Sequence, residues 1–385
     1  MRPQNEAELA ELVAGAEGPL RIQGGGTRDI GPAVEGAALQ TEGLGGVRLH
    51  EPGALTLVVG AGTPVAEVEQ ALAAEGQRLA FEPMDHRALL GTQGTPTIGG
   101  VVAANVSGPR RVQVGACRDF LLGVRFVDGM GRVVRNGGRV MKNVTGYDLV
   151  KLLAGSRGTL GVLTELSFKV LAIPETEVTL VARGLDPVTG VAALSTALGS
   201  PYDVTGAAHL ATGDESRTQV RIEGLAGSVA YRSGRLAGLL PGFEPVEGAA
   251  SAALWAEVRD VTPFAGRAGA VWRLSVRPSD GPGVSAALAE AGLDHAAIFD
   301  WGGGLVWLLV EGEDGEDGAM GDAGAAAIRA TLAGIGGHAT LVRASAALRA
   351  AVPVFQPEAP AVALLSRGLR QKFDPRGILN PGLMG

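Results

Sequence analysis

Two long runs of glycine, alanine, threonine and other small residues constrain this chain more than any other feature of its sequence. They are GTPTIGGVVAANVSGPRR, residues 94–111, and KNVTGYDLVKLLAGSRGTLGVLTELSFKV, residues 142–170. A third glycine-rich loop, IQGGGTRDIG at 22–31, follows a predicted strand. Small side chains let a long, flat ligand lie against main chain, with hydroxyls and N–H groups as polar partners. Close packing of helices on a sheet would use the same residues, so these runs alone leave both interpretations open.

The glycine loops do not match the common phosphate-binding motifs. No G-x-G-x-x-G opens a helix after the first predicted strand, and no G-x-x-x-x-G-K-[ST] occurs in the chain. The sequence therefore predicts neither a Rossmann dinucleotide site nor a P-loop.

The length of 385 residues exceeds the usual size of a single core and predicts at least two domains. The first part alternates short β-rich runs with glycine turns, and helices are expected at 64–76 and 147–155. After Pro174 a strand-helix-strand-strand-helix pattern occurs twice, followed by an amphipathic helix near the C-terminus. The fold class expected is α+β, with three segments: a first domain over 1–172, a smaller sheet-and-helix domain over 173–350, and a C-terminal segment over 351–385.

Composition excludes several classes of function. Cys117 is the only cysteine, so this chain alone forms no internal disulfide and holds no cysteine-ligated iron-sulfur cluster. A net charge of −7 argues against nucleic acid as the partner. The acidic N-terminal stretch and the absence of a long apolar run predict a cytoplasmic protein with at most peripheral membrane association through partners.

Four motifs together resemble the flavin-binding domain of the FAD-linked oxidases of the vanillyl-alcohol oxidase, or p-cresol methylhydroxylase (PCMH), type. The motifs are GGGT at 24–27, TIGGVVAANVSGPRR at 97–111 with the CRDFLLGVRFVDGMGRV that follows it, GRVMKNVTGYDLVKLLAGSRGTLGVLTELSFKV at 138–170, and FDPRGILNPG at 373–382. Within this family the chain is most similar to the FAD-binding E subunits of glycolate oxidase. The resemblance implies a two-subdomain, PCMH-type fold for the first domain and a C-terminal segment that returns to it.

The resemblance also implies which residues would hold FAD. The first glycine loop and the 97–105 stretch would line the pyrophosphate, Val162 and Thr164 would reach the adenosine end through main chain, and Asn380 would approach the isoalloxazine. The full set is Gly24, Gly25, Gly26, Thr27, Thr97, Ile98, Gly99, Gly100, Asn105, Gly108, Gly115, Val162, Thr164 and Asn380.

Two departures from the family pattern modify this expectation. Members with covalent flavin carry a histidine next to the first glycine loop, which here is QGGGTRDIG, so we expect non-covalent FAD. The five histidines are too far apart in sequence for normal ligand spacing, so we expect no metal site.

Oxidation of a 2-hydroxy acid at a flavin needs a cation for the carboxylate and a base for the hydroxyl proton. Candidate cations are Arg110, Arg111 and Arg343. The best candidate base is His338 in GGHATLVR, followed by Tyr147 and His86. Each of these residues also has a purely structural interpretation, and Cys117 is expected to be buried and unreactive.

The sequence favours an FAD-binding subunit of a glycolate-oxidase-like complex that acts on a small 2-hydroxy acid. The resemblance implies two partners, a longer FAD-linked catalytic subunit and an iron-sulfur subunit that takes the electrons onward. Two alternatives are a stand-alone FAD-dependent 2-hydroxy-acid dehydrogenase of the lactate type and a non-catalytic scaffold with a vestigial flavin site.

Overall fold

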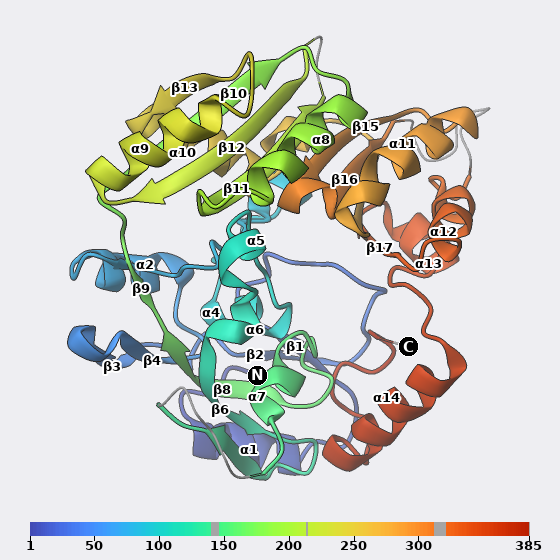
Figure 1. Ribbon diagram of the computed structural model, residues 1–385. Coiled ribbons are helices and arrows are strands. Elements are labelled where there is room, and N and C mark those ends of the chain that lie inside the picture. Colours follow the sequence, from blue (N-terminus) through green and yellow to red (C-terminus); the bar gives the residue numbers. More distant parts are fainter. Residues whose placement is uncertain (140–145, 213–214, 312–320, 385) are drawn as a thin grey trace.

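The computed structural model describes residues 1–139, 146–212, 215–311 and 321–384. Lys142 to Thr145 of the second small-residue run and most of the acidic stretch at 311–324 therefore lie outside the described residues. In Figure 1 a large sheet forms the upper part of the molecule, a smaller sheet forms the lower part, and the short helices α4, α5 and α6 lie between them.

The first 172 residues form a five-stranded sheet and two small strand pairs. The five-stranded order is β3-β4-β8-β6-β7, with every neighbouring pair antiparallel. The bounds are β3 Val47–Glu51, β4 Thr56–Gly60, β8 Val162–Lys169, β6 Leu121–Val127 and β7 Val133–Gly137; the small pairs are β1 Leu20–Gln23 with β2 Ala37–Gln40, and β5 Gln77–Arg78 with β9 Leu171–Ala172. Strands β6 and β7 form an antiparallel hairpin that turns after Val127.

Seven α-helices accompany these strands in the described part of residues 1–172, and most of them are short. They are α1 Glu6–Ala14, α2 Val65–Ala73, α3 Arg87–Leu90, α4 Ile98–Ala103, α5 Arg111–Val114, α6 Cys117–Phe120 and α7 Leu149–Leu153. Asn5 caps α1 by accepting a hydrogen bond from the Glu8 backbone N–H at 2.9 Å. Helices α2 and α7 lie where the periodicity predicted them.

The two strand-helix-strand-strand-helix patterns build one eight-stranded sheet of order β13-β10-β12-β11-β15-β16-β14-β17. Each half has the connectivity of a ferredoxin-like unit, and the antiparallel β11–β15 pair joins the two halves. The elements are β10 Thr176–Arg183, α8 Pro187–Leu198, β11 Val204–Ala211, β12 Arg217–Gly224, α9 Ala226–Ala237, β13 Glu244–Glu247 and α10 Gly248–Arg259, then β14 Ala270–Ser275, α11 Gly281–Glu290, β15 His295–Asp300, β16 Leu305–Val310, α12 Ala325–Ala333 and β17 His338–Arg343.

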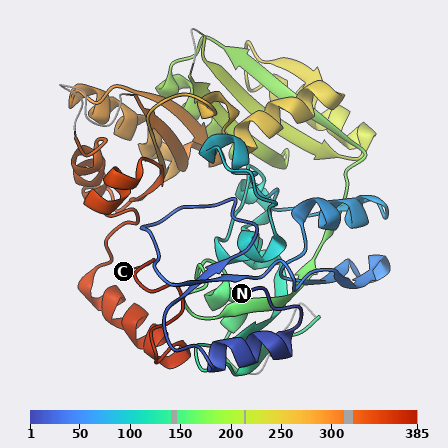
Figure 2. The same ribbon diagram turned by 180° about the vertical axis from the view of Figure 1, so that it is seen from behind.

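The chain then returns to the first part through α13, Ala346–Ala351, and the exposed helix α14, Pro360–Phe373. Figures 1 and 2 show α14 on the outer side of the molecule, connecting the region of the large sheet to that of the small one. After α14 the chain bonds to β1, because the Leu20 N–H donates to Ile378 O at 2.7 Å and the Asn380 N–H donates to Leu20 O at 3.0 Å. The C-terminal residues therefore contact the glycine loop that follows β1.

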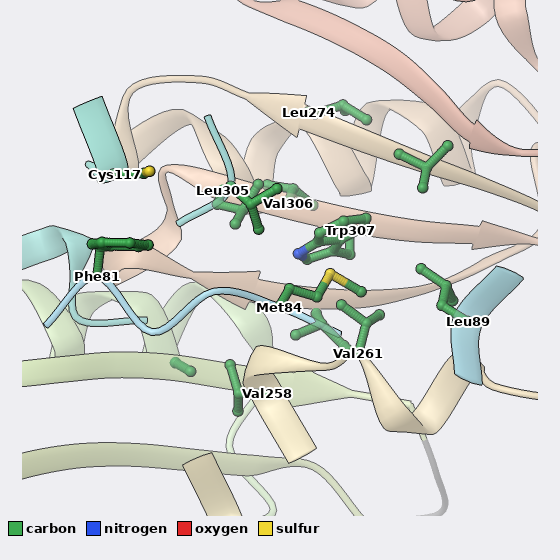
Figure 3. Close-up of a cluster of buried hydrophobic side chains, with 14 of the residues drawn as sticks. Phe81, Met84, Leu89, Cys117, Val258, Val261, Leu274, Leu305, Val306 and Trp307 are labelled. Atoms are coloured by element: carbon green, nitrogen blue, oxygen red, sulfur yellow. The ribbon is translucent and has the colours of Figure 1, made fainter. Parts of the chain in front are cut away.

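A continuous apolar cluster joins the large sheet to the loops of the first part. Met84 and Leu89 belong to loops and helices of the first part, whereas Val261 and Trp307 belong to the second, and all four are buried in one cluster. Figure 3 shows Met84, Val261 and Trp307 together in this cluster. The interface is thus packed as a protein core, so it fixes the relative position of the residues that line it.

Candidate functional site

The first cavity, of about 530 Å³, lies along the glycine loop that follows β1. Its walls come from this loop, from the start of α4, from the segment 157–163 and from the C-terminal residues Asn380 and Leu383. Four segments far apart in sequence therefore meet here, and two of them belong to the small-residue runs that the sequence singled out.

The glycines in these walls have two different structural roles. A Cβ on Gly25 would lie 1.6 Å from Thr95 O, and one on Gly94 would lie 1.6 Å from Gly25 O, so these glycines allow two loops to contact each other. A Cβ on Gly26 would meet no atom within 4 Å, and one on Gly100 would approach Arg28 Nη1 to 3.1 Å at the cavity wall. Main chain therefore faces the cavity at Gly26 and Gly100, as a long, flat ligand requires.

Most of the residues expected to hold FAD line one of two cavities. Nine line the first: Gly24, Gly25, Gly26, Thr27, Thr97, Gly99, Gly100, Val162 and Asn380. Asn105 and Gly108 line a second cavity described below.

The other three lie elsewhere. Ile98 is fully buried within α4, and Gly115 ends α5 with a positive φ of 93°. Thr164 donates a hydrogen bond from its hydroxyl to Glu6 Oε1 at 2.6 Å, which ties β8 to α1.

Asn380 connects the C-terminal segment to two other cavity walls. Its Oδ1 accepts a hydrogen bond from the Ile22 N–H at 2.7 Å, and its Nδ2 donates to Arg157 O at 2.8 Å. The residue is buried and its φ is +44°, a conformation that asparagine tolerates better than most residues. Asn380 thereby positions the backbone on both sides of the first cavity.

The second cavity, of about 260 Å³, adjoins the first, because Arg28, Ile30, Ala104 and Arg157 line both. One side is a face of the large sheet. Alternate residues of a strand point to the same face, and the lining residues follow this spacing: Arg273 and Ser275 on β14, Leu305 and Trp307 on β16, and His338, Thr340 and Val342 on β17. The opposite side consists of loops and helix ends of the first part, including His86 and Arg111, and of the end of α10.

The second cavity is strongly cationic. Arg28, Arg111, Arg157 and Arg273 line it, and none of them forms an ion pair with a carboxylate among the residues that the structure describes. Burial lowers the pKa of Arg28, Arg157 and Arg273 to about 10, so all three remain protonated at neutral pH. Buried cations need a counter-charge, so this arrangement favours an anionic ligand.

Trp301 holds two of these arginines at one wall. The guanidinium of Arg111 lies 4.5 Å from the ring centroid of Trp301 and that of Arg273 lies 5.3 Å from it. The indole Nε1–H donates to Gly108 O at 3.0 Å, although Gly108 belongs to the first part of the chain. The Trp301 backbone has a φ of +53°, which is costly for a bulky residue and is maintained by these contacts.

Asp300 is the one carboxylate among the described residues that line the second cavity. It is 3% exposed, and its Oδ1 accepts a hydrogen bond from the Trp301 N–H at 2.7 Å. Burial raises its pKa to about 7. Neither Asp300 nor Arg273 was predicted from the sequence. The available signal for Asp300 was FDWGGG, in which an acid ends a predicted strand just before a tight glycine turn.

Two histidines face the second cavity. His86 is buried, and its Nδ1 accepts a hydrogen bond from Arg28 Nε at 3.1 Å. Burial and the Arg28 charge lower the pKa of His86 well below its usual value, so the imidazole is neutral. His338 lies on the edge strand β17 and remains exposed on one side; desolvation and Arg273 lower its pKa.

The remaining catalytic candidates lie away from this cavity. The Arg343 guanidinium donates to four backbone oxygens, of Leu89, Phe264, Arg267 and Gly269, at 2.7–3.3 Å. Tyr147 is 87% exposed on the surface. Arg110 is buried in an ion pair with Glu223, and burial lowers its pKa to about 9. Cys117 is fully buried, and burial raises the pKa of its thiol, so it is not a reactive thiolate at neutral pH.

Comparison with known proteins agrees with the fold. Residues 1–137 match the FAD-binding domain family. The chain is 34% identical over 368 residues to glycolate oxidase subunit GlcE of Escherichia coli, covering 95% of this chain and 92% of the relative. It is also 32% identical over 189 residues to a D-lactate dehydrogenase of Archaeoglobus fulgidus, covering 45% of this chain and 41% of the relative.

Among solved structures, an alkyldihydroxyacetonephosphate synthase superposes with a TM-score of 0.72 at 17% identity, covering 99% of this chain and 76% of that one, which indicates a shared fold. Fold and sequence together place the chain in the FAD-dependent oxidoreductases. Within that class it belongs to the family of glycolate oxidase subunit GlcE. None of the helices in the described part of the chain is long and apolar enough to cross a membrane.

Proposed function

We propose that this chain is the FAD-binding subunit of a glycolate-oxidase-like complex and takes part in oxidising a 2-hydroxy acid, glycolate to glyoxylate. The observation that carries the proposal is the pair of adjoining cavities: one is lined by main chain and the other by unpaired guanidinium groups. The first suits a dinucleotide and the second suits a small carboxylate placed at one end of it.

The first cavity fits FAD because its wall at Gly26 and Gly100 is a cradle that a Cβ would fill. We assign the pyrophosphate to the loop 24–27 and the start of α4, and the ring system to the end of the cavity near Arg28 and Arg157, where the second cavity begins. When bound, FAD would accept the two electrons that leave the substrate. No His, Cys or Tyr among the described residues lines the first cavity, which supports non-covalent attachment.

The second cavity supplies the groups that orient a 2-hydroxy acid. Arg111 and Arg273 come from different parts of the chain and both contact Trp301, so they present donors to one carboxylate from a fixed wall. Two guanidinium groups can hold a carboxylate in a defined orientation. His338 lines the same cavity and remains a candidate for the hydroxyl proton.

The proposed assembly contains a longer FAD-linked subunit and an iron-sulfur subunit that receives the electrons. This part rests on similarity over nearly the whole chain to a protein named as a subunit. We further propose a cytoplasmic location and a division into domains at 1–172 and 173–350, followed by the segment 351–385. The two main sheets, which fall on either side of residue 173, support this division.

The proposal is tested by measuring FAD uptake and glycolate-dependent dye reduction by the purified chain, alone and with the two partner subunits. We expect one FAD per chain and turnover in the complex. Gly100→Val in the same complex should lose the FAD of this chain. A folded chain that binds no added FAD would contradict the proposal and favour a vestigial site.

A further inference from the structure

Asp300 is a buried carboxylate in the wall of the second cavity and is not part of an ion pair. It ends β15, is followed by the tight turn Trp301–Gly303, and is almost fully buried. Its Oδ1 accepts the Trp301 N–H, while Oδ2 has no hydrogen-bond donor among the described residues. Asp300 lines the second cavity, and its Oδ2 is not among the side-chain atoms that are fully enclosed without a hydrogen-bond partner.

A structural role does not explain this carboxylate. A buried carboxylate is costly unless it is paired, and a carboxylate kept for stability would form an ion pair with a nearby guanidinium. Five arginines line the same cavity, yet none of them forms an ion pair with Asp300. An asparagine would accept the same Trp301 hydrogen bond without the cost of a buried charge.

We propose that Asp300 accepts the hydroxyl proton of a small 2-hydroxy monocarboxylate in the second cavity, so that this chain oxidises substrate at its own flavin. The inference rests on the proposed function, because FAD is the oxidant. In the step, the substrate O–H bond breaks and its proton goes to Asp300 Oδ2. The α C–H bond breaks and its hydrogen leaves with the electron pair, which FAD takes up. The C–O bond becomes C=O, so the acid loses two electrons and FAD gains two.

The surroundings favour Asp300 over the other groups that could accept a proton. A general base works best when its pKa is near the working pH, and burial brings the pKa of Asp300 to about 7. His86 Nδ1 already accepts from Arg28, so in the neutral ring Nε2 carries the proton and cannot accept another one. His338 lies at the exposed edge of the cavity. The other charged groups lining it are Arg28, Arg111, Arg157, Arg259 and Arg273.

The first test is independent of turnover and compares two ligands of nearly the same shape. 2-Hydroxyisobutyrate has no α-hydrogen and cannot be oxidised, whereas isobutyrate lacks the hydroxyl. With the FAD-loaded chain, we expect the hydroxy acid to bind roughly tenfold or more tightly, because its hydroxyl donates to a charged acceptor. Asp300→Ala should reduce this preference to less than about threefold. If calorimetry shows the same preference for the hydroxy acid in the wild-type chain and in Asp300→Ala, the proposal is overturned.

The second test follows anaerobic reduction of the FAD-loaded chain by glycolate or lactate between pH 5.5 and 8.5. We expect the rate to rise with pH through a midpoint near 7 as the base ionises. Asp300→Asn should slow reduction about a hundredfold or more and remove that midpoint, with FAD content unchanged. The exposed Asp294→Asn is the matched control and should leave both rate and midpoint unchanged.

The outcomes separate this inference from the proposed function. If Asp300→Asn stays within about threefold of the wild-type rate with the same midpoint, the base is another group. If the complex turns over glycolate but this chain's flavin is never reduced, the inference fails and the subunit role stands. A chain that takes up no FAD contradicts the proposed function itself.

Discussion

Replacing Glu223 by glutamine tests whether buried ion pairs hold the large sheet against the flavin-binding part. Glu223 lies on β12, and its side chain is 2% exposed. It accepts hydrogen bonds from Arg78, at 2.8 Å, and from Arg110, and it lies 3.3 Å from Arg221. Arg78 and Arg110 belong to the first part of the chain, so this carboxylate neutralises guanidinium groups from both sides of the interface.

A second carboxylate completes the network. Glu82 accepts two hydrogen bonds from Arg221, both at 2.9 Å, and one from the Arg110 N–H at 3.1 Å. Although burial alone would raise the pKa of Glu82, Arg221 lowers it below the ordinary value of 4.5. The stability contributed by Glu82 is therefore complete at neutral pH. This stabilisation is lost as the pH falls from 4.5, the ordinary pKa of a glutamate, through the lower pKa that Glu82 has in the folded protein.

The expected cost of Glu223→Gln is about 3–5 kcal/mol, because removing one partner leaves buried guanidinium charge uncompensated. The glutamine amide would also direct its own N–H groups toward the N–H groups of the surrounding guanidiniums. The matched control is Glu215→Gln, whose partner Arg183 is 3.7 Å away and where both side chains are about 60% exposed. An exposed pair of this kind contributes about 0–1 kcal/mol.

Urea unfolding followed by circular dichroism measures both variants. We expect Glu223→Gln to unfold at a clearly lower urea concentration than wild type, and Glu215→Gln at nearly the same one. If both variants lose the same small amount of stability, the buried network does not hold the interface and the reasoning is refuted.

Three further substitutions test individual contacts. Gly100→Val should keep a native circular dichroism spectrum but take up no FAD. The control Gly227→Val, on an open helix surface, should take up FAD normally. FAD uptake by both variants would show that Gly100 does not line the flavin site. Thr164→Val should lower the free energy of unfolding in urea by about 1 kcal/mol, because the hydrogen bond to Glu6 is lost, and should leave the FAD content unchanged. A loss of FAD would instead indicate that Thr164 contacts the cofactor. Asn380→Ala should lower the free energy of unfolding by about 1–3 kcal/mol and weaken FAD binding, because the Arg157 carbonyl loses its hydrogen bond. An unchanged FAD affinity would show that this hydrogen bond does not position the cavity wall.

The sequence predicted the local elements because hydrophobic period and turn residues determine them locally. Helix α2, the β6–β7 hairpin and the repeated strand-helix pattern all follow from neighbours in the chain. That the two repeats join edge to edge through β11 and β15 depends on long-range pairing, which no local pattern indicates.

The site shows the same limit. Glycine loops and family motifs mark the first cavity, because close backbone approach requires particular residue types. The roles of Arg273 and Asp300 depend on their burial and on neighbours from strands distant in sequence, and no local sequence pattern indicates either. Arg343 shows the reverse case: its residue type suggested a carboxylate ligand, but the fold surrounds its guanidinium with backbone oxygens.

The most direct test of the account is an experimental structure of the FAD-loaded chain with 2-hydroxyisobutyrate. We predict that FAD lies along the Gly26 and Gly100 wall with its ring system at Arg28 and Arg157, and that the acid lies between Arg111, Arg273 and Asp300. FAD bound elsewhere, or an acid bound outside the second cavity, would contradict it.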